Sequence, residues 1–433
     1  MTIERKVGMG IAGQPSGGPT DVAEVFSTYL YTGTGSAQTI NNGIDLAGEG
    51  GLVWIKNRDS ALEHILTDTE RGANKTLHSD STAAEFTASP TMLSSFTSTG
   101  FSVGTSNSVS YNNDKYASFT FRKKSGFFDC VTWTGNGVAG REISHGLNGP
   151  VGMMIVKDID TSTSSWATYH KSLGATKYMY LEATGGANTH IGFWNDTEPT
   201  DSVFTIGSLT AVNNVLGDTY VAYLFADNSS EDAEDQMIKC GSYTGTAADL
   251  SINLGWEPQF LLIKNTTSAA DWYMVDTMRG FTATSLTNEH LSPNSSNAEA
   301  KVGNVVYDKF LNSTGFNVLA NASQFNTNNQ TYIYMAIRAP MMVEPEAATD
   351  VFHVNASQGN FGSPSFYSTG FDVDMAITKN YSAGASYYNG SRFAGSGQFL
   401  RPDNTNAEDN GGPFLFDVSD GVTKTGGGGN GND

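Results

Sequence analysis

One nine-residue apolar stretch occurs three times in this chain, and its recurrence constrains the fold more than any other feature. The copies are Asp114–Arg122, Asp218–Ala226 and Gln330–Arg338, and each has Tyr at its third position within a run of aromatic and aliphatic residues. Such runs, entered through Asn- or Gly-rich turns, are typical of β-strands. A strand that returns at intervals of roughly 110 residues predicts tandem domains built on one plan.

Other motifs keep the same order within each unit. Every repeat contains a second strand that is apolar almost throughout, as in Gly51–Asn57, which predicts burial of both its faces. The shared order predicts that two residue types occupy equivalent places in the three repeats. These are the tyrosines Tyr116, Tyr220 and Tyr332, and the lysines Lys56, Lys157 and Lys264.

Short β patterns without long helical periodicity predict an all-β fold. We expect tandem β-sandwiches of the jelly-roll or lectin-like kind, arranged in a row behind an extended N-terminal arm. A fourth, divergent repeat is incomplete, since no Tyr-bearing strand follows its last motif, and we expect a continuation of the chain or another chain to supply it. The boundaries are 1–24 for the arm, 25–122, 123–227 and 236–340 for the full repeats, and 349–433 for the fourth.

Charge and hydropathy exclude several classes of partner. The formal net charge is −20, and phosphates would be repelled by such a chain, so no nucleic-acid partner is expected. No run of about 18 apolar residues occurs, so we expect no membrane insertion. The low charged fraction of 16% and the abundance of Gly are typical of an all-β protein of an extracellular or particle surface.

The sharpest local motif is an Asp followed three residues later by Arg, with a Glu further downstream. The carboxylates could form the acid pair of a glycoside hydrolase, or the Arg could clamp a loop to the sandwich. We favour the clamp, because a motif repeated in most units suits a fold better than several active sites, and we assign no catalytic residue. The members are Asp68, Arg71 and Glu85, then Asp276, Arg279 and Glu299, with echoes at Arg392 and Glu408; the second repeat has Leu173 for the Arg and Glu198 in the matching loop.

Cysteine and histidine usage predicts neither a metal site nor a cofactor. Cys130 and Cys240 each lie three residues before an aromatic residue in successive repeats, so we expect free thiols in separate domains. The seven histidines show no zinc-ligand spacing. No glycine-rich phosphate loop leads into a helix.

Two sets of residues are candidates for binding. The Gly- and Pro-rich arm cannot fold alone, so we expect it to dock on another chain of a particle through a few apolar anchors. Aromatic rings beyond the needs of a core are candidates for stacking on a host cell-surface glycan. The anchors are Ile3, Val7, Met9 and Ile11, and the rings are Trp166, Trp194 and Trp272.

Taken together, several motifs carry a resemblance. The stretches 51–58, 68–72, 127–137, 144–147, 169–174 and 194–199 resemble repeat proteins of marine tailed bacteriophages, described as tail fibre or virion structural proteins with a domain of unknown function. The resemblance covers about Val22 to the C-terminus and brings no catalytic residues.

The resemblance implies a structural protein of the virion tail in a phage of marine bacteria, cyanobacteria above all, assembled in the host cytoplasm. It implies other virion proteins as partners, such as a tail or adaptor protein, a homotrimer, and a role in host attachment. A capsid-decoration or baseplate protein with carbohydrate-adhesive sandwiches is the alternative, and a polysaccharide depolymerase is the third. We expect no enzymatic activity.

Overall fold

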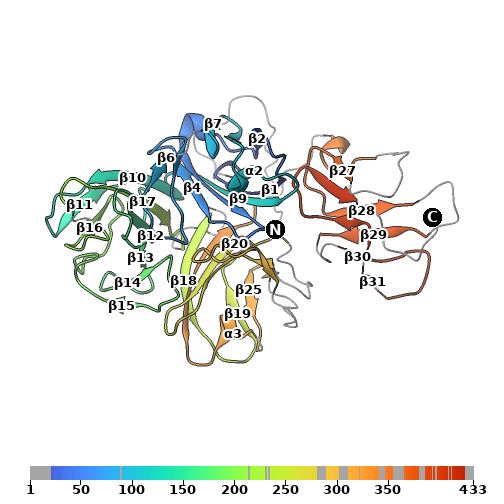
Figure 1. Cartoon of the computed structure of the whole chain (residues 1–433). Coiled ribbons are helices and arrows are strands. Elements are labelled where there is room, and N and C mark those ends of the chain that lie inside the picture. The colour runs from blue at the N-terminus through green and yellow to red at the C-terminus, as the bar shows by residue number, and fades with distance from the viewer. Residues whose placement is uncertain are drawn as a thin grey trace, which may run out of the picture.

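The computed structural model describes residues 21–424 apart from short internal segments. These segments are 88–89, 213–214, 230–231, 233–234, 280–288, 302–310, 321, 341–346, 355–364, 380–385, 393, 395–396, 408 and 411. The described chain is almost entirely antiparallel β-structure, which confirms the predicted all-β class (Figure 1). The arm residues Ile3, Val7, Met9 and Ile11 lie outside the described residues.

The first repeat consists of two sheets. Its larger sheet has the order β1 (Phe26–Thr32), β9 (Lys115–Arg122), β3 (Gly51–Asn57) and β4 (Ile65–Asp68). Its smaller sheet has the order β2 (Gln38–Asn41), β8 (Gly100–Val103) and β7 (Leu93–Thr97). Short elements complete it: η1 (Val22–Glu24), α1 (Leu46–Glu49), α2 (Asn107–Ser110), β5 (Lys75–Thr76) and β6 (Phe86–Thr87).

The second and third repeats restate this plan. In the second, the larger sheet runs β10 (Phe128–Thr134), β17 (Thr219–Ala226), β12 (Val151–Asp158), β13 (Ala167–His170), β14 (Lys177–Tyr180) and β15 (Asn188–Thr189), beside β11 (Arg141–Ser144) and β16 (Val203–Ile206). In the third, it runs β18 (Ile238–Thr244), β26 (Thr331–Arg338), β20 (Pro258–Asn265) and β21 (Trp272–Asp276), over β19 (Leu250–Asn253), β25 (Gly315–Val318) and β24 (Leu311–Asn312). Its short elements are β22 (Glu289–His290), β23 (Ala300–Lys301) and α3 (Ser323–Asn326).

The predicted equivalence of the repeats is confirmed. The Tyr-bearing strands β9, β17 and β26 are each paired on both edges, in the same register. Each tyrosine stacks on an aromatic ring of the first strand, with centroids 5.0–5.5 Å apart. The three lysines also occupy one register position, opposite Ala117, Val221 and Ile333.

Each larger sheet buries both of its faces, but against different neighbours. In β9, Tyr116 belongs to the first repeat's own core, whereas Phe119 and Phe121 belong to a core shared by all three repeats. Phe121 makes ring contacts with Phe225 of the second repeat and Phe260 of the third, at 5.3 and 6.3 Å. The expected row of independent sandwiches is therefore replaced by three sandwiches around a common core.

Backbone hydrogen bonds close this arrangement into a cycle, which we call the three-repeat ring (residues 21–340). Glu85 N donates to Ile159 O between the first two repeats, at 2.7 Å. The same contact joins the second repeat to the third and the third to the first, and each is 2.8 Å long. These two pairs are Ala187 N to Thr266 O, and Glu299 N to Arg58 O.

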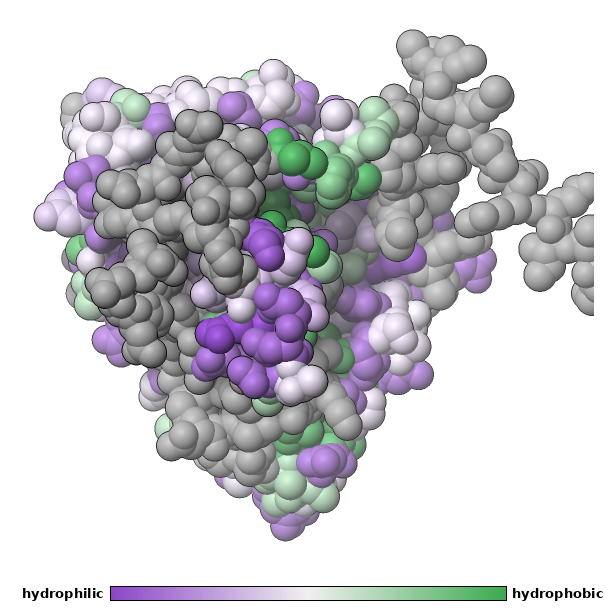
Figure 2. All heavy atoms as spheres, turned by 90° about the vertical axis from the view of Figure 1, so that its right-hand side faces the viewer, coloured by the Kyte–Doolittle hydropathy of each residue, from purple (hydrophilic) through white to green (hydrophobic). Residues whose placement is uncertain are grey.

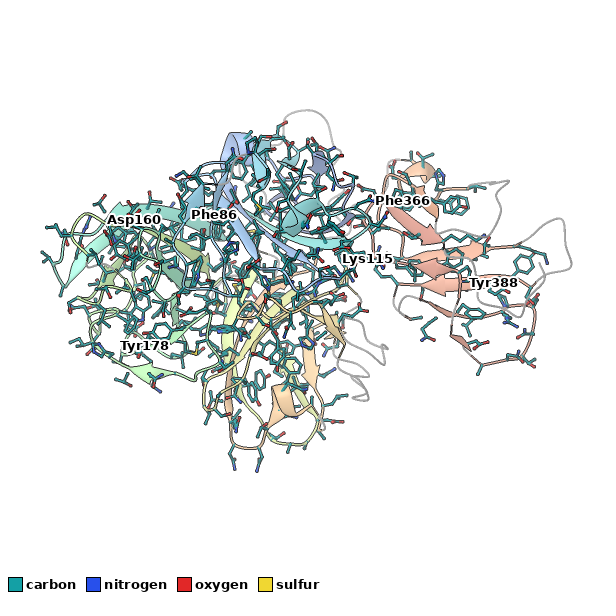
Figure 3. All side chains as sticks on the ribbon, viewed as in Figure 1. Phe86, Lys115, Asp160, Tyr178, Phe366 and Tyr388 are labelled. Carbon is teal, nitrogen blue, oxygen red and sulfur yellow. The ribbon has the colours of Figure 1, made fainter. Side chains whose placement is uncertain are left out.

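A smaller C-terminal unit (described residues 347–424) lies beside the ring. It contains η2 (Ala348–Asp350), β27 (Ser365–Ser368), β28 (Met375–Thr378), β29 (Tyr388–Ser391), β30 (Gln398–Phe399), β31 (Asp409–Asn410), β32 (Phe414–Leu415) and β33 (Gly421–Lys424). Lys115 of the ring forms an ion pair with Asp417 at the junction (Figure 3). Leu30 N also donates to Ser419 Oγ at 3.1 Å.

Candidate functional site

The Asp–Arg–Glu motif forms a buried cluster in the first and third repeats. Arg279 Nε lies 2.5 Å from Asp276 Oδ2, its Nη1 lies 2.9 Å from Glu299 Oε1, and its Nη2 donates to the Met274 carbonyl. Arg71 makes the same contacts with Asp68 and Glu85, at 2.6 and 2.9 Å. The carboxylates are thus saturated by Arg in positions that substrate does not reach, which is the geometry of a structural clamp.

These clusters also join neighbouring repeats. Glu299 Oε2 accepts from Nη2 of Arg58 in the first repeat at 2.8 Å, and Tyr223 of the second repeat donates to Asp68 at 2.8 Å. Burial alone would raise the pKa of Glu299, but the charges of Arg58 and Arg279 outweigh it and hold that pKa below its ordinary value. The motif is therefore part of the ring interface as well as of each loop.

The second repeat departs from the predicted correspondence. Its ring contact places Ala187, and not Glu198, at the position of Glu85 and Glu299. Glu198 instead accepts from the Tyr169 hydroxyl at 2.6 Å and from Ala175 N at 2.7 Å. The match of Glu198 to the Glu85 loop is thus corrected: Ala187 follows Leu173 by 14 residues, as Glu85 follows Arg71, whereas Glu198 follows it by 25.

The echo of the motif in the C-terminal unit is also corrected. Arg392 N donates to the Asp374 carbonyl as Thr69 N does to that of Gly51, so Arg392 takes the place of Thr69 rather than of Arg71. Its Nη1 donates to the carbonyls of Met278 and Phe416. Glu408 lies outside the described residues.

The three tryptophans proposed for glycan stacking lie in the shared core. Trp166, Trp194 and Trp272 are 0%, 1% and 1% exposed. The indole N–H of each donates to a backbone carbonyl, and two of these bonds cross between repeats: Trp166 to His78, and Trp272 to Tyr180. No indole face reaches solvent. These tryptophans therefore pack inside the three-repeat ring and are not placed to bind sugar.

Both cysteines are free and buried, as predicted. They lie in the shared core and not inside separate domains: Cys240 Sγ is 2.6 Å from the point where a side chain on Gly152 of the second repeat would begin. Burial raises the pKa of both thiols well above the ordinary value, so neither is poised as a thiolate.

Two of the three equivalent lysines join neighbouring repeats, a role that sequence reasoning missed, whereas Lys56 Nζ donates to carbonyls of its own repeat. Lys157 Nζ donates to the Thr82 carbonyl of the first repeat at 3.1 Å, and Lys264 Nζ donates to the Thr184 carbonyl of the second at 2.7 Å. Burial lowers the pKa of Lys56, Lys157 and Lys264 to about 8. The sequence does show a lysine next to the last residue of each apolar strand, but it does not indicate which carbonyl group accepts its hydrogen bond.

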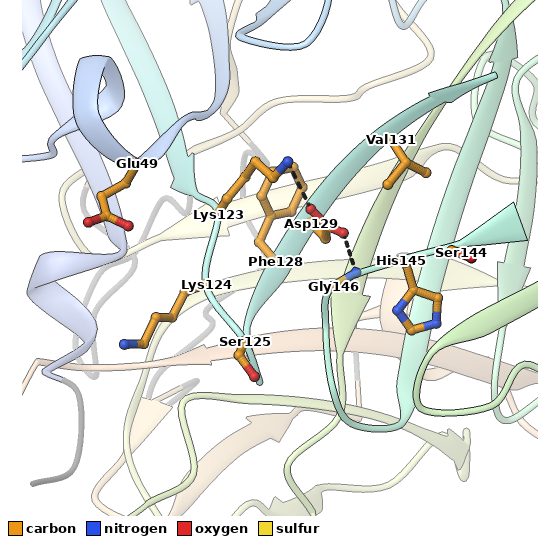
Figure 4. A pocket seen from close by; sticks show the side chains of 10 residues that line it. All are labelled: Glu49, Lys123, Lys124, Ser125, Phe128, Asp129, Val131, Ser144, His145 and Gly146. Carbon is orange, nitrogen blue, oxygen red and sulfur yellow. Dashed lines mark hydrogen bonds and ion pairs between the residues drawn. The ribbon is translucent and has the colours of Figure 1, made fainter. Parts of the chain in front are cut away.

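A surface hollow of about 540 Å³ lies where the first two repeats meet (Figure 4). Lys123 Nζ lies 3.3 Å from Asp129 Oδ1 and 2.6 Å from Glu70, while Asp129 Oδ2 accepts from Gly146 N at 2.6 Å. His145 Nε2 faces the Thr200 carbonyl, and burial lowers the pKa of this histidine. The charges of Lys123, Glu70 and Asp129 are thus engaged with one another, which is a structural arrangement.

A larger and more apolar groove, of about 760 Å³, lies in the C-terminal unit. We call it the C-terminal groove; residues 350–354 line one part of it, and residues 371–378 line another. Figure 2 views the molecule from the side of this unit, where apolar and hydrophilic side chains adjoin. Eight of the twelve large apolar side chains exposed among the described residues belong to this unit: Val351, Phe352, Val354, Phe366, Met375, Ile377, Tyr387 and Leu400. Such a concentration makes this unit the candidate interaction surface of the described chain.

Other kinds of site were sought in the part of the chain that the structure describes. Within it, no group of three or more His, Cys, Asp or Glu side chains is arranged to hold a metal ion. No described helix is long and apolar enough to span a membrane.

Comparison with known protein families gives a match. No curated protein matches the chain. The family described as "Domain of unknown function (DUF7483)" matches residues 21–340, which is the extent of the three-repeat ring and leaves out the C-terminal unit. Because this match spans well over half of the chain, the protein belongs to the DUF7483 family.

Proposed function

We propose that this chain is a structural protein of a bacteriophage particle, a tail fibre or tail appendage that assembles as a homotrimer and takes part in host attachment. The all-β repeat architecture, the net charge of −20 and the resemblance of the motifs to phage tail proteins support it. The observation that carries the trimer is an exposed apolar face on the C-terminal unit.

This face corresponds to the one that each repeat buries in the ring. By strand pairing, Met375, Ile377 and Leu400 stand where the first repeat has Leu52, Trp54 and Leu77. The ring residues are 0–2% exposed, whereas their counterparts are 55%, 58% and 46% exposed. The ring shows how such faces are covered: three of them meet around one core. Three C-terminal units from three chains can meet in the same way, giving a threefold fibre.

Light scattering on the purified chain tests the assembly. We expect a mass three times the 46.1 kDa of one chain. Leu400→Asp should give the monomer, because it places a charge in the apolar contact. Val138→Asp is the matched control, since Val138 is 58% exposed on the ring, and it should leave the trimer intact. A wild-type chain that stays monomeric at every concentration contradicts the trimer.

Immunogold electron microscopy of phage particles that encode the chain tests the location. Antibodies against the purified protein should label the tail of intact particles. Label on the capsid surface would favour a decoration protein, and particles without label would contradict a virion role altogether.

A further inference from the structure

The C-terminal unit repeats the plan of the ring repeats strand by strand. β27, β33 and β32 pair in the register of β2, β8 and β7. β28 pairs with β29 in the register of β3 with β4, and a single bridge then follows in both cases, Asn389 to Leu400 and Leu66 to Leu77. Strands of this unit can therefore be assigned to their counterparts in the repeats.

One strand of the plan has no counterpart among the described residues of the C-terminal unit. In every repeat the second edge of the apolar strand (β3, β12 or β20) is covered by a Tyr-bearing strand, which also pairs with the first strand. Within the described part of the C-terminal unit, β28 pairs with β29 alone. No described strand therefore pairs with the side of β28 that corresponds to the β9 side of β3, and an edge of this kind offers backbone N–H and C=O groups to a partner.

The C-terminal groove lies at this open edge. Residues 373–378, which include β28, line one part of it, and residues 350–354 line another. Residues 350–354 precede β27 in the chain, as β1 precedes β2 in the first repeat. They therefore correspond to β1, the first strand of each repeat. Their apolar side chains are open to solvent: Val351, Phe352 and Val354 are 58%, 66% and 74% exposed. The corresponding residues of β1, by contrast, lie against β9.

We propose that the C-terminal groove accepts an additional β-strand, delivered by a second polypeptide and inserted between residues 350–354 and β28. The strand has the chemistry of the internal copies: Tyr near its start, followed by residues that are apolar on both faces. The three copies in this chain are each buried along nearly their whole length and paired on both edges, so none of them is free to fill the groove.

The side chains that the groove would recognise can be inferred by comparing the core of the C-terminal unit with that of the first repeat. Among the described residues, the core cluster of the C-terminal unit contains four buried apolar side chains, whereas that of the first repeat contains twelve, including Tyr116 stacked on Tyr31. A donated tyrosine would enter this sparse core beside Phe414 and Val422. The groove is also lined by Asp350, Asp372 and Asp374, which favours a strand with basic residues at its ends, as Lys115 and Arg122 are in β9. Main-chain pairing then gives affinity, and the tyrosine gives specificity.

The proposal is tested with a synthetic peptide of the sequence Asp114–Arg122 added to the full chain. Calorimetry should show saturable binding of one peptide per chain. Hydrogen exchange should slow in residues 350–354 and 373–378 and stay unchanged in the ring. The control is the same peptide with Ser118→Pro, which cannot pair as a central strand and should bind at least ~10-fold more weakly. On the protein, Phe352→Asp should weaken binding, and Val138→Asp should not.

Several results would overturn the proposal. These are the absence of saturable binding, equal binding of the proline peptide, or protection confined to the ring. A peptide of residues 1–14 that binds more tightly than the Tyr-bearing peptide would assign the groove to the arm of a second copy instead. Met375 and Ile377 belong both to the groove lining and to the face that the proposed trimer buries. The two proposals are separated by measuring binding on the Leu400→Asp variant, whose substituted side chain lies outside the groove lining.

Discussion

At the scale of single residues, the ring depends on charged groups buried at the contacts between repeats. Arg279 is 2% exposed and binds two carboxylates and a backbone carbonyl, and its guanidinium lies 5.6 Å from the ring of Phe119 in the first repeat. Asp276 and Glu299 have little access to water, so their charges depend on this one partner and, for Glu299, on Arg58 as well. Removing a single member leaves the others without compensation.

Arg279→Met should therefore lower the free energy of unfolding by about 3–5 kcal/mol, the usual cost of leaving a buried carboxylate unpaired. Urea denaturation of the two proteins measures the difference. Arg141→Met serves as the control, because the Arg141 guanidinium donates to the Thr134 carbonyl near the surface. A loss below about 1 kcal/mol for Arg279→Met would mean that the clamp is not needed.

Lys157 links the first two repeats, and burial lowers its pKa to about 8, below the usual value of 10.5. The folded chain then binds fewer protons at this residue than the unfolded chain between those two pH values. Stability therefore rises with pH in that window, and the cost of burying the charge is greatest below pH 8.

Relative to Lys157→Met, the wild-type protein should gain about 1.5 kcal/mol of unfolding free energy between pH 8 and 9.5. Denaturation of both proteins at the two pH values measures this, and the difference cancels titrations that they share. Lys177→Met, at an exposed lysine, should show no such gain. A difference that does not change with pH would mean that Lys157 keeps its ordinary pKa.

At the scale of elements, each Tyr-bearing strand is fixed to the turn that precedes it. The Tyr116 hydroxyl donates to the Asn107 carbonyl at 2.6 Å and accepts from Tyr111 N at 2.7 Å. Val215 N and Thr327 N lie at 3.1 and 3.0 Å from the corresponding hydroxyls of Tyr220 and Tyr332. One side chain thus fixes both the register of the strand and the position of the turn.

Tyr116→Phe should cost roughly 2 kcal/mol, because it removes one hydroxyl and leaves buried polar groups of the turn without it. Thermal or urea unfolding measures the loss. Tyr111→Phe is the control, since the Tyr111 side chain is 49% exposed and its loss should change little. Equal losses of unfolding free energy in the two variants would show that the buried Tyr116 hydroxyl stabilises the fold no more than an exposed one.

At the scale of the whole molecule, the three repeats share a core, so we expect them to unfold together. Phe121 contacts Phe26 of its own repeat at 5.1 Å and Phe128 of the second repeat at 5.7 Å, as well as one further ring each of the second and third repeats. Phe101, in contrast, lies in the core of the first repeat alone. The two positions separate contacts that hold the ring from contacts that hold one sandwich.

Phe121→Ala should lower stability by about 3–5 kcal/mol, as is usual for a buried Phe. It should also speed hydrogen exchange in all three repeats. Phe101→Ala should have a similar total cost but speed exchange first in the first repeat. If Phe121→Ala speeds hydrogen exchange in the first repeat alone, the shared core does not couple the unfolding of the three repeats.

The all-β class, the order of motifs along the chain and the equivalence of the repeats could be predicted from the amino-acid sequence, because alternation, turn residues and the Tyr-bearing motif are local signals. The sequence also predicted the Asp–Arg contact, in which the partners lie three residues apart, and the free state of the thiols. The ring, the burial of Trp166 and Trp272, and the place of Arg392 could be seen only in the folded chain. These depend on which apolar faces meet across more than a hundred residues of chain. A strand that is apolar on both sides indicates that both faces are buried, but it carries no information about the partner that buries them.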